Sequence, residues 1–135
     1  MKATELCVGN YVIAEDTICN VVKIDKNVIT VDPMREDGLW IYPDIEDITP
    51  IMLTDDILLK NDIVKVEDSI CFIWKHNSYL GGTISLFPAI NTGYNVVITS
   101  PVINYDTERY SGNITSVHKL QNILNMFGFD IEIKL

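Results

Sequence analysis

The stretch that decides the fold is residues 116–135, SVHKLQNILNMFGFDIEIKL. Its first half places apolar residues at the spacing of one stripe along an α-helix; these are Val117, Leu120, Ile123, Leu124 and Phe127. Gly128 can take the left-handed conformation that ends a helix, and Phe129 and Leu124 would then form the apolar pair of a Schellman motif. The pattern therefore predicts an amphipathic helix with a glycine stop.

The residues on either side of this helix predict a cap before it and a strand after it. A hydroxyl of Thr115 or Ser116 is expected to cap the first turn, since it can accept a hydrogen bond from a backbone N–H there. After the glycine the apolar period changes to two over residues 129–135, which predicts a half-buried strand. The helix and this strand can bury their apolar faces only against other elements. An apolar strand at a sheet edge also suggests a homodimer that pairs across that edge.

Short runs of β-branched and apolar residues, separated by turn residues, occupy most of the remaining chain. Over residues 1–50 this pattern predicts a small SH3-like curled sheet. A short helix is expected after Thr54, whose hydroxyl can cap it. Residues 51–135 are expected to form a mostly antiparallel sheet with the C-terminal helix packed on one face. The predicted fold class is strand-rich α+β, with subdomains 1–50 and 51–135 in one compact unit.

Two prolines mark expected strand ends. Residues 39–42 are expected to form a strand that ends at Pro43, with the exposure of Trp40 left open. Residues 94–99 are expected to form a strand that Pro101 stops, because proline has no N–H for a sheet ladder.

Two groups of polar and aromatic residues are candidates for a contact surface. Residues 105–112 are expected to form a polar loop that presents Tyr105 and Tyr110. His118, Gln121 and Asn122 lie on the polar side of the predicted helix. These three could contact a protein partner or a small ligand. The blander and more common alternative is a solvated helix face whose amides satisfy the backbone of an adjacent loop.

The sequence holds little recognisable chemistry. The three cysteines, Cys7, Cys19 and Cys71, lack zinc-ligand spacing and indicate reduced, mostly buried thiols. A Cys71–His76–Asp constellation, or a metal site of His76, His118 and a cysteine, is the weaker alternative. The chain contains no phosphate-binding loop, dinucleotide fingerprint or H-E-x-x-H motif. We therefore expect no catalytic residues, no cofactor and no metal.

The charge balance bounds the partners. With 10 basic and 19 acidic residues, the net charge is −9, which argues against direct nucleic-acid binding and against an anionic membrane surface. The acids between residues 44 and 56 match no calcium-loop spacing. No apolar run approaches the length of a membrane span, and the first residues lack a signal-peptide core. We therefore expect an acidic cytoplasmic protein with a protein partner.

Three segments carry a resemblance to a known family. They are the L-x-x-G-N-x-V opening at residues 6–12, the P-I-x-L-T segment at 50–54 and the V-H-x-L-Q-N segment at 117–122. With these in order, the chain resembles a family of small uncharacterised proteins from Bacteroides-type gut bacteria and their prophages. The resemblance implies a bacterial, cytosolic protein associated with a mobile element, and it implies no activity. Residues 61–63 depart from the family, which has a Phe-Gly-Phe type of segment there.

Three functions compete. The first is a non-enzymatic accessory or protein-interaction protein of a phage or mobile element. The second is an acidic protein that modulates nucleic-acid enzymes by mimicking the charge of DNA, which should place acids in rows on one face. The third is an enzyme with a dispersed site, which would need a pocket containing His76 or His118. The first is the expectation taken forward.

Overall fold

The computed structural model describes residues 1–135 except 27, 68, 77–81, 91, 103–104 and 130. Only the backbone is described for residues 75–76, 82, 100–102 and 105–111. The chain divides into two compact units. Unit 1 contains Met1–Met52 and Ser116–Ile123, and unit 2 contains Leu53–Thr115 and Leu124–Leu135. The division falls within the C-terminal helix α2 (Val117–Met126). Two antiparallel sheets and this helix confirm the predicted strand-rich α+β class.

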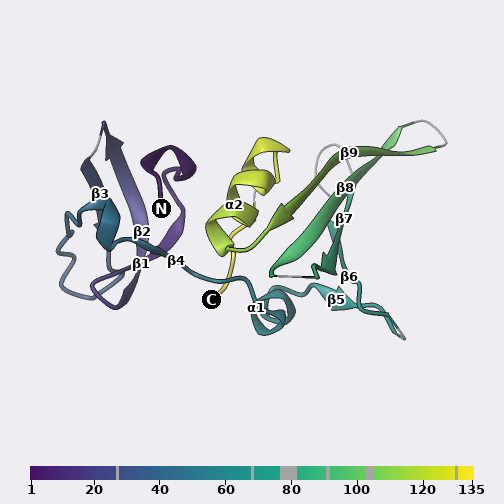
Figure 1. The fold of residues 1–135 in the computed structure, drawn as a ribbon, viewed down its shortest axis with the longest axis horizontal. Helices are drawn as coiled ribbons and strands as arrows, with labels where there is room; N and C mark the ends of the chain where they lie inside the picture. Colours follow the sequence, from purple (N-terminus) through teal and green to yellow (C-terminus); the bar gives the residue numbers. More distant parts are fainter. Residues whose placement is uncertain (27, 68, 77–81, 91, 103–104, 130) are drawn as a thin grey trace. The chain divides into compact units, whose positions relative to one another are not determined.

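Unit 1 is built on a four-stranded antiparallel sheet in the order β3-β2-β1-β4 (Figure 1). Its strands are β1 (Tyr11–Ala14), β2 (Thr17–Asp25), β3 (Val28–Asp32) and β4 (Thr49–Pro50). Two short 3-10 helices, η1 (Ala3–Glu5) and η2 (Ile45–Asp47), precede β1 and β4. The first three strands follow the short apolar runs of the sequence, which is why the pattern predicted them.

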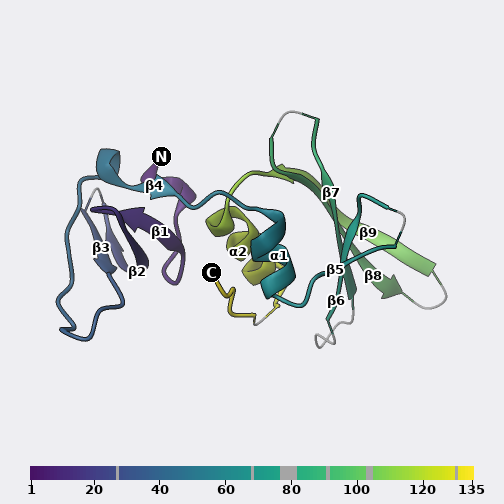
Figure 2. The ribbon, with the colours of Figure 1, turned by 90° about the horizontal axis from the view of Figure 1, so that it is seen from below.

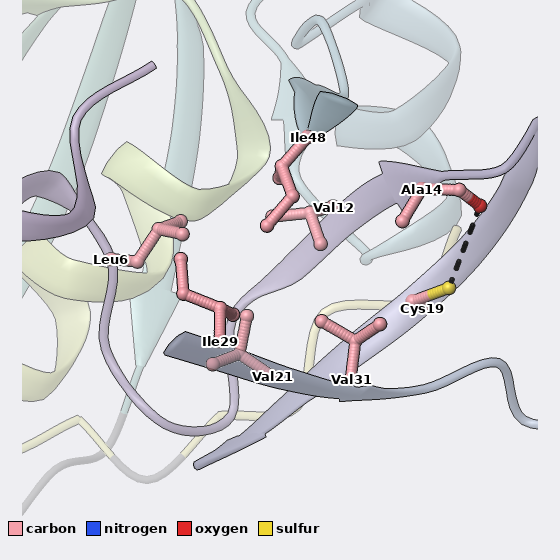
Figure 3. Packing of buried hydrophobic residues seen from close by; sticks show 8 residues of the cluster. All are labelled: Leu6, Val12, Ala14, Cys19, Val21, Ile29, Val31 and Ile48. Atoms are coloured by element: carbon pink, nitrogen blue, oxygen red, sulfur yellow. Dashed lines mark hydrogen bonds between the residues drawn. The ribbon is translucent and has the colours of Figure 1, made fainter. Parts of the chain in front are cut away.

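The core of unit 1 lies on one face of this sheet, because successive strand side chains point to opposite faces. Figure 3 shows its eight residues: Leu6, Val12, Ala14, Cys19, Val21, Ile29, Val31 and Ile48. The thiol of Cys19 points along the sheet to the carbonyl oxygen of Ala14, 3.9 Å away. Leu6 and Ile48 come from segments next to the sheet, so the segments before β1 and β4 help to cover the core.

Unit 2 contains a five-stranded antiparallel meander in the order β5-β6-β7-β8-β9 (Figure 2). Its strands are β5 (Val64–Lys65), β6 (Phe72–His76), β7 (Gly82–Pro88), β8 (Tyr94–Val102) and β9 (Tyr105–Ile114). The predicted short helix is α1 (Asp55–Lys60), and the Thr54 hydroxyl accepts a hydrogen bond from the N–H of Ile57 at 3.3 Å. This confirms the predicted cap.

Aromatic contacts fix α1 and the meander in unit 2. Phe72 and Tyr94 meet edge to face with ring centroids 6.1 Å apart, a favoured geometry for aromatic pairs. The Tyr94 hydroxyl donates a hydrogen bond to the carboxylate of Asp55 in α1, and burial together with this carboxylate raises the pKa of the phenol. Just before Tyr94, Gly93 has φ +78°, and an added Cβ would lie 2.1 Å from the carbonyl oxygen of Ile114. Only glycine fits this position.

The end of α2 follows the prediction, whereas one of the two caps expected at its start is absent. Gly128 has φ +72°, the N–H of Phe129 donates to the carbonyl of Leu124 at 2.9 Å, and the N–H of Gly128 donates to that of Asn125 at 3.1 Å. These are the two bonds of a Schellman motif. At the other end, the buried hydroxyl of Ser116 has no hydrogen-bond partner among the described residues. Ser116 is therefore not the cap, and a cap by Thr115 stays a prediction.

The predicted final strand is also wrong, since residues 129–135 form no strand in the part of the chain that is described. Their alternation of burial is nevertheless present, with Phe129 and Ile133 buried. The side-chain amide of Asn61 takes the place of a strand partner: it accepts from the N–H of Lys134 at 2.7 Å and donates to its carbonyl at 2.8 Å. A homodimer through a C-terminal strand edge therefore loses its structural premise.

The β8–β9 hairpin corrects two further predictions. β8 runs through Pro101, and residues 105–112 belong to β9 instead of a polar loop. The pairing of β7 with β8 is described only as far as Thr99, and beyond it β8 pairs with β9. Proline is tolerated where one side of a strand has no neighbour, because no ladder bond needs its N–H. Polar residues can occupy such a hairpin when its faces are not all buried.

Candidate functional site

The amide of Gln121 binds the backbone at the start of β1. Its Oε1 accepts from the N–H of Tyr11 at 2.9 Å, and its Nε2 donates to the carbonyl of Gly9 at 3.1 Å. Gln121 is 8% exposed. The side chain therefore satisfies one backbone donor and one acceptor, which a buried segment needs.

Asn122 and Asn10 extend this contact to the N-terminal residues. Asn122 Oδ1 accepts from Asn10 Nδ2 at 2.9 Å, and Asn122 Nδ2 donates to the carbonyl of Glu5 at 2.9 Å. Asn10 is fully buried, and its Oδ1 accepts from the N–H of Cys7 at 2.8 Å. We call Asn10, Gln121 and Asn122 the amide clamp, because together they hold residues 5–11 against α2.

His118 lies one helical turn before the clamp and is 2% exposed. Neither ring nitrogen has a hydrogen-bond partner among the described residues. Burial lowers the pKa of its imidazole, with a smaller contribution from Lys119. His118 and Gln121 therefore present no exposed face in this structure, and the clamp matches the alternative interpretation of amides that satisfy a nearby backbone. A role of these residues in contacting a partner stays a prediction.

The other predicted contact residues lie in β9. The backbone of Tyr105 and Tyr110 belongs to that strand, and their side chains lie outside the described residues. The same holds for the His76 side chain, whose backbone ends β6. A contact surface at Tyr105 and Tyr110, and a constellation of Cys71 with His76, therefore stay untested predictions.

Two of the three cysteines are buried, namely Cys19 and Cys71, whereas Cys7 is exposed. Burial raises the pKa of the thiol of both buried residues. A thiol with a raised pKa is protonated at neutral pH, and the protonated form is a poor nucleophile. Among the described residues, no group of three or more histidine, cysteine or acidic side chains is placed to hold a metal ion.

The most exposed apolar group of unit 1 lies between β3 and η2. Leu39 is 68% exposed, Trp40 55% and Tyr42 66%. Ile41 between them is partly buried against the core, and it exchanges two backbone hydrogen bonds of 3.0 Å with Val31. Because side chains alternate along extended backbone, this inward anchor leaves Trp40 and Tyr42 facing outward. We call residues 39–42 the aromatic loop.

Local hydrogen bonds order the approach to the aromatic loop. Asp32 Oδ1 accepts from the N–H of Met34 at 2.9 Å, and Asp37 Oδ1 accepts from that of Leu39 at 3.2 Å. The guanidinium of Arg35 donates to the hydroxyl of Thr17 at 2.9 Å. The exposed side chains therefore stand on a pre-ordered segment, which lowers the entropy cost of binding through them.

An acidic hollow lies beside the segment that follows this loop. It has a volume of about 330 Å³ and is lined by Ile13, Glu15, Asp16, Pro43, Asp47 and Thr49. The three acidic residues in its lining are exposed. Pro43 directly follows the aromatic loop in the chain, so an apolar surface and a negatively charged hollow are neighbours in unit 1.

Sequence reasoning missed the aromatic loop because it expected a strand over residues 39–42. The structure forms only an isolated bridge there, between Val31 and Ile41. The signal that could have found the loop is its surroundings: Pro33, Gly38 and Pro43 bracket the apolar run. Such residues interrupt strands, and three large apolar residues outside regular structure favour a surface role.

Comparisons with known proteins give no relative: no family model matches the chain, and no curated protein or solved structure matches it significantly. Within the described residues, no helix is both long enough and apolar enough to cross a membrane.

Proposed function

We propose that the protein is a non-enzymatic interaction protein, and that the aromatic loop is its docking surface. The single observation that carries this is the exposure of Trp40 and Tyr42, two positions apart on the outward side of the segment, with Leu39 next to them in the chain; each is more than half exposed. Aromatic residues are enriched at protein interfaces, and contiguous exposed apolar surface marks such sites. The resemblance to proteins of gut bacteria and their prophages supports an accessory role in a mobile element.

Charge selects the class of partner. Exposed acids flank the aromatic loop in sequence on both sides, namely Glu36, Asp37, Asp44, Glu46 and Asp47. The only basic residue in the sequence of residues 33–50 is Arg35, so this segment is negatively charged overall. Complementary charge steers encounter and disfavours like-charged partners. The partner we propose is therefore a protein with an apolar patch beside basic side chains, one of which enters the acidic hollow.

The net charge of −9 is also compatible with a more specific partner, the DNA-binding surface of a nucleic-acid enzyme. Proteins that bind nucleic acid carry basic surfaces, because lysine and arginine side chains neutralise the phosphates. The alternative function is therefore modulation of a nucleic-acid enzyme by occupation of its DNA-binding surface. Competition by duplex DNA distinguishes this alternative from binding at any other basic surface.

The test compares partner capture by three forms of the chain. Tagged wild-type protein, a Trp40→Ser/Tyr42→Ser variant and a Val28→Ser control are used to capture proteins from the host, which are identified by mass spectrometry. Val28 is 56% exposed on β3 of the same unit and lies outside the loop. We expect the wild type and the control to retain a common basic partner, and the loop variant to lose it. Capture should weaken between 0.1 and 0.5 M salt, roughly the range in which exposed charges become screened.

Two results would contradict the proposal. One is that the loop variant retains the same partner as the wild type. The other is that every form captures only acidic or neutral proteins with no dependence on salt. Circular dichroism of the loop variant should match that of the wild type, because both replaced side chains are exposed.

A further inference from the structure

The first turn of α2 holds a histidine that the fold leaves without hydrogen bonds. Both Nδ1 and Nε2 of His118 are buried and have no partner among the described residues. A neutral imidazole has one donor and one acceptor, so it leaves two polar atoms unsatisfied here. A protonated imidazole would bury a full charge as well, at a much higher cost. The closed form of unit 1 therefore holds His118 neutral.

The charges that act on His118 give little compensation for protonation. Lys119 on the same helix and the amino group of Met1 oppose a positive charge, whereas Glu5, from η1, favours one. Glu5 is exposed, so water screens its effect. Its backbone carbonyl is already bonded by Asn122. Met1 and Glu5 of the N-terminal segment therefore lie near enough for their charges to act on the imidazole.

His118 shares a helix face with the amide clamp. Residues three and four positions apart are neighbours on a helix, so His118 lies directly before Gln121 and Asn122. Those two side chains make four hydrogen bonds to the segment from Glu5 to Tyr11. Movement of α2 away from the segment that the clamp holds would bring water to this helix face, on which His118 lies. Release of the clamp would therefore solvate the imidazole.

We propose that His118 and the amide clamp form an acid-sensitive latch, in which protonation of His118 releases residues 5–11 from α2. Above about pH 6.5, the ordinary pKa of histidine, the imidazole is neutral in both the closed and the open form, and the latch has its full stability. Below that pH the open form takes up a proton that the closed form excludes. Acid therefore favours opening by about tenfold per pH unit, until the pH reaches the lower pKa of the closed form.

The test measures hydrogen exchange in the full-length protein between pH 7.5 and 5.0, with rates corrected for intrinsic exchange. The N–H of Tyr11 reports the latch directly, because Gln121 on α2 bonds it. The N–H of Cys7 reports the Asn10 side chain, which loses its α2 partner Asn122 when the latch opens. The N–H of Val96 in β8 of unit 2 is the internal reference. We expect the opening of the latch amides to rise as the pH falls below about 6.5, by at most about tenfold per pH unit, with no such rise for the reference.

Three further measurements decide the role of His118. A His118→Met variant should lose the acid-dependent opening, and a His76→Gln variant, which changes the only other histidine, should keep it. In the wild type, NMR titration of the His118 ring should give a pKa below the ordinary value, and this needs no variant to fold. The proposal fails if the rise persists in His118→Met. It also fails if the His118 ring titrates at its ordinary pKa while the latch amides stay protected.

Discussion

Gln121 shows how a single side chain can replace a strand neighbour. Its amide bonds the N–H of Tyr11 and the carbonyl of Gly9, which are groups that a sheet ladder would otherwise satisfy. A Gln121→Met change keeps the length and helix preference of the side chain but removes both bonds. We expect the free energy of unfolding to fall by about 2 kcal/mol, because a buried backbone group loses its partner. Urea unfolding followed by circular dichroism measures the change.

The adjacent Lys119 supplies the control for this prediction. It lies on the same helix and is exposed, so Lys119→Met should change stability by less than about 0.5 kcal/mol. Equal losses in the two variants would mean that the Gln121 bonds contribute nothing beyond the composition of the helix. Measurement at pH 7.5 keeps His118 neutral and separates this effect from the latch.

At this scale the sequence could not separate a wet polar face from a buried one. The pattern placed His118, Gln121 and Asn122 opposite the apolar stripe, and helix periodicity says only that they share a side. What buries that side is a segment 112 positions away, reached through Asn10. A partner so distant in the chain leaves no local signal, whereas the Gly128 stop depends on neighbours in sequence and was predictable.

Among the elements, the turn of the β1–β2 hairpin holds two non-glycine residues in the left-handed conformation, which lowers stability. Its two central residues, Glu15 and Asp16, have φ +48° and +56°, and two-residue hairpin turns of this kind prefer Asn-Gly. A Glu15→Asn/Asp16→Gly change should raise the free energy of unfolding by about 1 kcal/mol, since glycine and asparagine adopt this region more easily. Thermal unfolding measures the gain.

The same change tests the acidic hollow, because Glu15 and Asp16 both line it. The more stable variant should bind the proposed basic partner more weakly. A Glu15→Gln/Asp16→Asn variant removes both charges and replaces each side chain with one of similar shape, so it should weaken binding to the same degree. Unchanged binding in both would remove the hollow from the proposed docking surface.

The C-terminal segment depends on an element far from it in sequence. Asn61, which follows α1, bonds the backbone of Lys134 twice and the carbonyl of Ile57 once. Asn61→Ala should lower the free energy of unfolding by about 2 kcal/mol, because partly buried backbone groups lose their partners. It should also expose the N–H of Lys134 to hydrogen exchange. Lys134→Ala is the control, since that side chain is exposed and only its backbone is bonded. A Lys134 N–H that stays protected in Asn61→Ala would show that another contact holds the segment.

At the scale of the whole chain, the local patterns predicted most elements and the fold class. They failed where strand formation depends on hydrogen bonding to residues distant in the sequence. The apolar alternation of residues 129–135 was correct for burial and wrong for strand formation, because an amide side chain holds that backbone. The prediction of a strand end at Pro101 is wrong, because the effect of a proline depends on whether a neighbouring strand needs an N–H at that position. Strand order and the grouping of Ser116–Ile123 with the first unit are long-range properties that no local period encodes.

The stretch that begins at Ser116 contributes to both units, and this leads to a prediction for truncated chains. A chain that ends at residue 115 loses the amide clamp of unit 1 and the buried Leu124, Phe129 and Ile133 of unit 2. Each buried side chain contributes about 2 kcal/mol, and whole domains are stable by only about 5–15 kcal/mol. We therefore expect both units to lose their dispersed NMR signals.

A chain that ends at Gly128 should separate the two effects. It keeps residues 116–123, and with them every bond of the amide clamp, so the signals of β1–β3 should persist. It loses Phe129 and Ile133, which are 4% and 2% exposed, together with the backbone that Asn61 binds, so hydrogen exchange in unit 2 should accelerate. If unit 1 instead keeps its signals in the chain that ends at residue 115, the clamp is dispensable, and the N-terminal sheet folds on the buried residues of its own strands.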